Sequence, residues 1–119
     1  MNSVTGPVYV TAVLRLFLDL PDTPRRASSY DQALARSLFE RGVPLNVVES
    51  ALLLGSLRRR NRPEGAAPLP PVRSLAYFSS VIDELQQQPL PDQYHGYLRS
   101  KADQLFRLTV QKTTFSSDR

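Results

Sequence analysis

Apolar residues recur along this chain at helical spacing, in five separate stretches. In the first stretch Val10, Val13, Leu14 and Phe17 fall at i, i+3, i+4 and i+7, which is the spacing of one helix face. No pair of alternating segments predicts paired strands, and no internal repeat is present. The pattern predicts an all-α fold, a single helical domain over residues 1–119 in which a compact bundle of about five helices forms. The predicted helices cover residues 7–20, 30–41, 44–60, 74–87 and 91–112, with a frayed tail over 113–119.

Local signals support several of these helix ends. Ser28 or Ser29 can cap the second helix, where Asp31 favours the positive end of the helix dipole. Gly42 follows the second helix at the position where a left-handed residue commonly ends a helix. Gly55 lies inside the third helix, where it costs about 1 kcal/mol relative to Ala. The presence of glycine despite this loss of helix stability predicts that another helix approaches closely at this position.

The third helix carries a dense set of apolar residues, so much of it is expected to be central; they are Val47, Val48, Ala51, Leu52 and Leu54. A proline-rich segment, Asn61–Val72, follows it with four prolines in twelve residues. This composition predicts a long surface loop between the third and fourth helices, extended and partly in the polyproline II conformation.

Composition excludes several classes of protein. The chain has no cysteine, so disulfides, thiolate metal sites and cysteine nucleophiles are excluded. No segment approaches the ~20 apolar residues that a membrane helix needs, and the N-terminus lacks the features of a signal peptide. A cytoplasmic protein with no membrane partner is therefore expected.

No residue pattern predicts catalysis. His95 is the only histidine, and a pair with Asp92 on one helix turn has no nucleophile marked beside it. The adjacent carboxylates Asp83 and Glu84 point in different directions on a helix, and no glycine-rich phosphate loop is present. We therefore expect no catalytic residues, no metal ligands and no cofactor, and we expect that the protein is not an enzyme.

The charge pattern is the strongest functional signal. The net charge is +4, and 13 of the 15 basic residues are arginines. Arg58, Arg59, Arg60 and Arg62 span little more than one helical turn, so they must fan around the end of the third helix. Two interpretations stay open: contact with phosphates, or a solvated helix end stabilised by the dipole. The candidate nucleic-acid-binding residues are Arg58, Arg59, Arg60, Arg62, Arg73, Arg25 and Arg26.

Two further features bear on nucleic-acid binding. The segment LARSLFERGVPLNVVESALLLGSLRRR has the pattern of a helix-turn-helix, in which Asn46 and Ser50 would read base edges. An ordinary αα-hairpin explains the same pattern and is favoured, because Glu49 would meet phosphates with the wrong sign. Tyr94 and Tyr97 can stack on unpaired bases, although helix-spaced tyrosines more often lie at the rim of a core.

The segment SLFERGVPLNVVESALLLGSLRRR, followed by a proline loop and VRSLAYFSSVIDEL, resembles the helical modules of DnaD-like primosome proteins and plasmid replication initiators. It is also similar to short proteins encoded on bacterial mobile elements. The resemblance covers roughly residues 34–86. It implies DNA binding, often with assembly on a partner or into oligomers. The Trp and Gly of the DnaD signature and its winged-helix domain are missing, which implies an accessory factor rather than a complete initiator.

The leading hypothesis is a small non-enzymatic nucleic-acid-binding accessory protein of a bacterial replication or mobile-element system, with DNA favoured over RNA. Its arginines would contact phosphates with little reading of bases. The alternative is a helical subunit for protein–protein interaction or assembly in a larger complex, as a homo-oligomer or with a protein partner. The apolar residues on several helix faces and the loop AAPLPP motivate that alternative.

Overall fold

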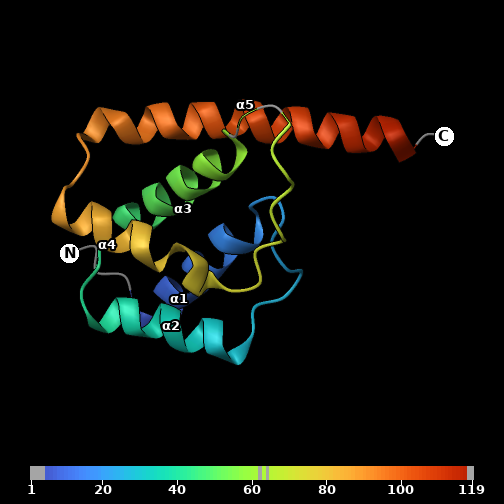
Figure 1. Ribbon diagram of the computed structural model, residues 1–119. Coiled ribbons are helices and arrows are strands. Elements are labelled where there is room, and N and C mark those ends of the chain that lie inside the picture. The colour runs from blue at the N-terminus through green and yellow to red at the C-terminus, as the bar shows by residue number, and fades with distance from the viewer. Residues whose placement is uncertain (1–4, 62, 64, 118–119) are drawn as a thin grey trace.

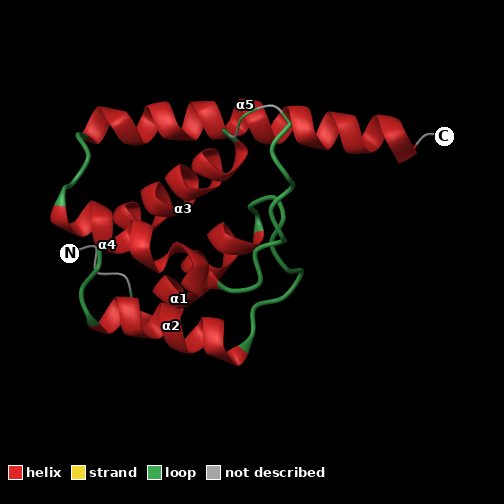
Figure 2. Ribbon diagram, in the orientation of Figure 1, coloured by secondary structure: helices red, strands yellow, loops and turns green. Residues whose placement is uncertain are grey.

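The computed structural model describes residues 5–61, 63 and 65–117, with side chains as far as Gln104. Its elements are α1 (Gly6–Leu18), α2 (Ser29–Glu40), α3 (Leu45–Arg60), the 3-10 helix η1 (Leu75–Phe78), α4 (Ser79–Gln87) and α5 (Asp92–Ser117). Every regular element in this part of the chain is helical, which confirms the predicted all-α fold with five helices (Figure 2). The predicted long loop between the third and fourth helices is confirmed over residues 61–74.

The predicted cap Ser74 is confirmed, whereas the predicted end of the fifth helix is wrong. The fourth helix begins with a 3-10 turn before its α-helical part, and Ser74 caps that turn by accepting a hydrogen bond from the backbone N–H of Ala76. The backbone of α5 stays helical to Ser117, so the helix end predicted at Lys112 is wrong. The frayed tail predicted over 113–119 stays a prediction.

The central helix is α3. It packs against α1, α4 and α5, whereas α2 packs against α1 and η1. In Figure 1, α5 runs along one side of the molecule and α2 along the opposite side, with α1, α3 and α4 between them. This arrangement confirms the prediction that α3 is central.

The core combines residues of the predicted helix faces with Val43 and Val72, which lie between helices. Phe17 and Phe78 are fully buried, and their rings meet edge to face with centroids 6.2 Å apart. A smaller apolar cluster of Leu53, Leu98 and Ala102 joins α5 to α3. The main core comprises Tyr9, Val13, Phe17, Leu20, Ala35, Leu38, Val43, Val48, Ala51, Leu52, Val72, Leu75, Phe78, Ile82 and Leu85.

Two glycines have the roles that the sequence predicts. A Cβ atom on Gly55 would lie 2.7 Å from Cδ1 of Phe78, so only glycine lets α3 approach the 3-10 turn this closely. Gly42 has a φ of +75°, and the backbone N–H groups of Gly42 and Val43 donate to the carbonyl oxygens of Phe39 and Leu38. This hydrogen-bond pair is the Schellman motif that ends α2.

Asp31 joins the beginnings of two helices. Ser28 caps α2 by accepting from the backbone N–H of Asp31, and Asp31 accepts from that of Ser28 in return. The Asp31 side chain is 1% exposed, and it also accepts from the Ser74 hydroxyl and the Leu75 backbone N–H. Burial opposes the charged form, but these hydrogen bonds outweigh it and lower the pKa of the Asp31 carboxyl.

The two interpretations of the α2–α3 segment are both wrong. The two helices do not pack along one another as in an αα-hairpin, because α2 lies on α1 and η1. A recognition helix must expose its reading face, but Ser50 is buried and bonded to His95 of α5. Asn46 is exposed, whereas Ser50 is not available to read bases.

None of the helices in the described part of the chain is both long and apolar enough to cross a membrane.

Candidate nucleic-acid interface

The arginines at the end of α3 point in three directions. Arg58 reaches Glu84 on α4, Arg59 reaches the proline loop, and Arg60 has no hydrogen-bond or ion-pair partner among the described residues. The three described members of the cluster therefore do not share one face. This divergence also means that the three side chains differ in their availability to a ligand.

Arg58 is held by a carboxylate. Its Nη1 and Nη2 donate to the two carboxylate oxygens of Glu84 at 2.9 and 2.8 Å, in bidentate geometry. Both side chains are about half exposed. The hydrogen bonds from Arg58 lower the pKa of Glu84, and the same contact raises the pKa of Arg58. A phosphate would therefore compete with Glu84 for this guanidinium.

The Arg59 side chain is engaged in contacts within the fold. Its side chain is only 8% exposed, and Nη2 donates to the Pro70 carbonyl oxygen at 2.8 Å. Its guanidinium also lies over the Tyr77 ring, 5.4 Å from the centroid, and 3.5 Å from the Asp22 carboxylate. Arg59 therefore ties the proline loop to α3 and has little surface left for a ligand.

The other predicted arginines are placed apart. Arg73 is exposed beside Arg59 and Tyr77, where it lines a hollow along the proline loop. Arg25 and Arg26 are exposed in the loop between α1 and α2, and like Arg73 they have no ion-pair partner among the described side chains. Arg62 lies outside the described residues. Of the predicted set, Arg58 and Arg60 line one groove, and Arg59 and Arg73 line the hollow along the proline loop.

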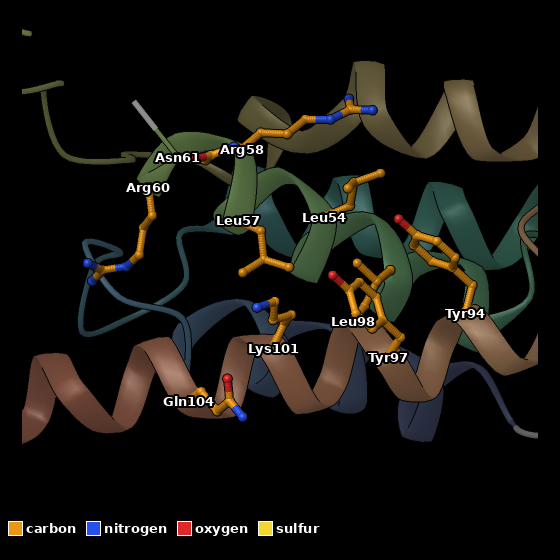
Figure 3. Close-up of a pocket in the computed structure, with 10 residues that line it drawn as sticks. All are labelled: Leu54, Leu57, Arg58, Arg60, Asn61, Tyr94, Tyr97, Leu98, Lys101 and Gln104. Carbon is orange, nitrogen blue, oxygen red and sulfur yellow. The ribbon is translucent and has the colours of Figure 1, made fainter. Parts of the chain in front are cut away.

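This groove lies between the C-terminal half of α3 and the first half of α5 (Figure 3). Its volume is about 540 Å³. Tyr94, Tyr97 and Lys101 project from α5 toward α3, and Arg60 lies at one end of the groove (Figure 3). The lining residues are Leu54, Leu57, Arg58, Arg60, Asn61, Tyr94, Tyr97, Leu98, Lys101 and Gln104.

The groove combines an apolar floor with a positive rim. Leu54, Leu57 and Leu98 form the floor, and no carboxylate is among the lining residues. Arg60 and Lys101 are exposed, and neither has an acidic partner in the part of the chain that the structure describes. We call this groove, with the ten lining residues given above, the α3–α5 groove.

Lys101 is a site residue that the charge pattern did not single out. It lies four residues after Tyr97 and seven after Tyr94, so all three share one face of α5. The helical spacing of Tyr94, Tyr97 and Lys101 in the fifth predicted helix could have identified Lys101 from the sequence. What the sequence could not provide is the partner face on α3, which only the fold places opposite.

A polar cluster outside the groove lining also joins α3 to α5. The Ser50 hydroxyl lies 2.7 Å from Nδ1 of His95, and Nε2 of His95 lies 3.4 Å from the Glu49 carboxylate, which Arg99 also contacts. These types of residue occur in hydrolase triads. Here Ser50 is only 7% exposed, although Ser50 and His95 both line a hollow at the start of α5. The cluster acts as a polar clamp that holds α5 on α3.

Within the described residues, no group of three or more His, Cys, Asp or Glu side chains is placed to hold a metal ion. Comparison with known proteins finds no protein family, curated protein or solved structure that matches this chain. The resemblance to DnaD-like modules therefore stays a hypothesis that rests on the sequence.

Proposed function

We propose that this chain is a small non-enzymatic protein that binds nucleic acid through the α3–α5 groove. DNA is the expected polymer, and an accessory role in bacterial replication or on a mobile element is the expected setting, on the strength of the resemblance. Arg60 and Lys101 are the primary phosphate contacts. Arg58 is a secondary contact because Glu84 competes for it.

The observation that carries this proposal is the contrast between paired and unpaired cations. Arg41, Arg58, Arg59 and Arg99 each have an acidic partner within the fold. Arg60 and Lys101 have none among the described residues, yet they lie on the two sides of one groove without a lining carboxylate. Phosphate groups bring the missing negative charge, and release of their counterions drives binding.

Salt-dependent anisotropy tests the proposal. The wild-type chain is titrated into labelled duplex DNA, single-stranded DNA and RNA over roughly 50 to 300 mM salt. We expect affinity to fall steeply with salt, and we expect the double variant Arg60→Gln/Lys101→Gln to bind more weakly. Its slope of log K against log salt is expected to be shallower by about 0.7 to 0.9 for each lost phosphate contact.

The matched control is Arg15→Gln/Arg36→Gln. Both residues are exposed cations on α1 and α2, neither of which packs extensively along α5 (Figure 1). The control removes the same charge from the surface but leaves the groove intact. Equal losses of affinity in the two double variants would show that net charge alone controls binding. Absence of binding at the lowest salt would refute the proposal. The exposed residues Arg25, Arg26 and Arg73 are tested by the same substitution, one at a time.

A second candidate function is favoured by the way the proline loop is anchored. Residues 65–71 are exposed, whereas Val72 is 2% exposed and its N–H donates to the Asp22 carbonyl oxygen at 2.8 Å. In the predicted polyproline II conformation, which has three residues per turn, Leu69 lies on the same edge as the buried Val72, although Leu69 itself is 37% exposed. The other edges then present Pro68, Pro71 and Arg73 to a partner.

The partner that fits this segment is a protein with an aromatic-lined groove and an acidic pocket for Arg73. A purified domain that reads polyproline II ligands ending in a basic residue provides the test. We expect the folded chain to bind it and Pro68→Ala/Pro71→Ala to lose binding. Binding by the free peptide of residues 66–73 but not by the folded chain would show that the fold hides the segment.

A further inference from the structure

Two exposed tyrosines distinguish the α3–α5 groove from an ordinary basic surface. Tyr94 is 39% exposed and Tyr97 is 53% exposed, and their ring centroids are 5.4 Å apart with planes inclined at 59°. Neither hydroxyl has a hydrogen-bond partner among the described residues. The two rings thus form a continuous aromatic surface above Leu98, which is buried.

The other described tyrosines that pack in the fold are used differently. Tyr9 is buried, and its hydroxyl donates to the Val43 carbonyl oxygen at 2.7 Å. Tyr77 accepts a hydrogen bond from Arg59 and lies beneath that guanidinium. Packing or hydrogen bonding explains these rings. The fold supplies no such explanation for Tyr94 and Tyr97, which have one aromatic face open to the groove.

We infer that the α3–α5 groove binds single-stranded nucleic acid, with unpaired bases stacked on Tyr94 and Tyr97 and the flanking phosphates on Arg60 and Lys101. This inference rests on the proposed function and names the form of nucleic acid that the site takes. In a duplex the base faces are already stacked on one another, so an aromatic platform gains nothing from them. In a single strand every base has a free face for stacking, whatever its identity.

The geometry indicates how the bases lie. The two rings already contact each other, so no base fits between them. The bases stack on the outer faces of the rings, toward Leu54 and Leu57 on the α3 side. The cations stand along the same groove, Lys101 one helical turn beyond Tyr97 and Arg60 across from it on α3 (Figure 3). A strand that follows the groove meets both rings and both cations without a carboxylate in its path.

The test compares ring removal with ring retention. Tyr94→Leu/Tyr97→Leu removes the aromatic faces and keeps apolar bulk, whereas Tyr94→Phe/Tyr97→Phe keeps the faces and removes only the hydroxyls. Affinity for a short labelled single strand is measured by anisotropy, beside the matching duplex and an abasic strand of equal length. We expect single strands to bind more tightly than the duplex. The Leu variant is expected to lose roughly 5- to 150-fold per ring, and the Phe variant to bind like wild type.

Tyr30→Leu is the matched control. Tyr30 is 63% exposed at the beginning of α2, outside the groove, so its replacement is expected to leave affinity unchanged. Far-ultraviolet circular dichroism of each variant verifies that the helices are retained. If the Leu variant unfolds, the abasic strand decides: weak binding of the abasic strand by wild type supports stacking.

The two proposals fail in different ways. Equal, salt-dependent binding of single strand, duplex and abasic strand, unaffected by Tyr→Leu, overturns the single-strand inference and leaves the proposed function standing. Absence of binding to any of the three at low salt refutes both. Single-stranded DNA and RNA of equivalent sequence then show whether the 2′-hydroxyl contributes.

Discussion

Oδ1 of Asp31 lies 3.0 Å from the backbone nitrogen of Leu75, 44 residues further along the chain. One buried carboxylate therefore stabilises the first turn of α2 and the first turn of η1 at the same time. The Ser74 hydroxyl donates to the same oxygen at 3.1 Å, so the end of the proline loop is fixed at this point. The proline loop enters η1 at a fixed position because Asp31 accepts hydrogen bonds from Ser74 and Leu75.

Asp31→Asn is predicted to destabilise the fold by about 2 kcal/mol. The amide keeps one oxygen, but its NH₂ group then faces a backbone N–H that needs an acceptor. Urea unfolding followed by circular dichroism measures the change. Asp83→Asn is the control, because Asp83 is 57% exposed and its replacement is expected to have little effect. Equal stability of Asp31→Asn and wild type would contradict the role of Asp31.

The same carboxylate predicts an acid-sensitive fold. Hydrogen bonding holds the pKa of Asp31 below the value of about 3.9 that an Asp has in an unfolded chain. The ionised form therefore contributes stability above the unfolded pKa, and this contribution is lost as the pH falls through the folded pKa. Urea midpoints measured from neutral pH to about pH 3 are expected to fall more for wild type than for Asp31→Asn. Parallel curves for the two proteins would refute this source of acid sensitivity.

Two glycines in helices predict opposite effects of the same substitution. Gly55→Ala places a Cβ against the Phe78 ring at 2.7 Å, so it is expected to destabilise the fold by about 1–3 kcal/mol despite the better helix propensity of Ala. Gly96→Ala in α5 meets no atom within 4 Å, so it is expected to stabilise by up to about 1 kcal/mol. Thermal unfolding of both variants measures the pair. Stabilisation by Gly55→Ala would show that Phe78 can move aside.

The features that could be predicted from the sequence are those determined by neighbouring residues. Helical spacing located α1 to α4 closely, and Gly42 marked the end of α2 because a left-handed residue is a local requirement. The small size of Gly55 predicted a close approach but could not identify Phe78 as the neighbour. The burial of Asp31 was not predictable, since its second helix partner lies 44 residues away.

The candidate site was predictable only in part for the same reason. The spacing of Arg58, Arg59 and Arg60 showed that they must diverge, but their partners are distant in sequence: Glu84, Pro70 and, for Arg60, none among the described residues. The charge pattern along the sequence gives no reason to expect that these three arginines differ in their availability to a ligand. The fold separates them because each side chain meets a different neighbouring segment. Lys101 can be identified as a lining residue of the groove only once the fold places α5 beside α3.

Glu84→Gln is predicted to strengthen nucleic-acid binding. The substitution removes the carboxylate that holds Arg58, and it leaves a guanidinium at the edge of the α3–α5 groove free to contact a phosphate. The expected result is tighter binding, with a salt slope steeper by about 0.7 for a single strand. Anisotropy titrations at several salt concentrations measure both quantities.

The control for this gain is Asp83→Asn, which removes one negative charge from the neighbouring position. It releases Arg41, at the C-terminal end of α2, instead of Arg58. If only the release of Arg58 matters, Asp83→Asn leaves the slope near that of wild type, and Glu84→Gln combined with Arg58→Gln loses the gain. A similar gain from both single variants would mean that net charge, rather than a freed Arg58 in the groove, controls binding.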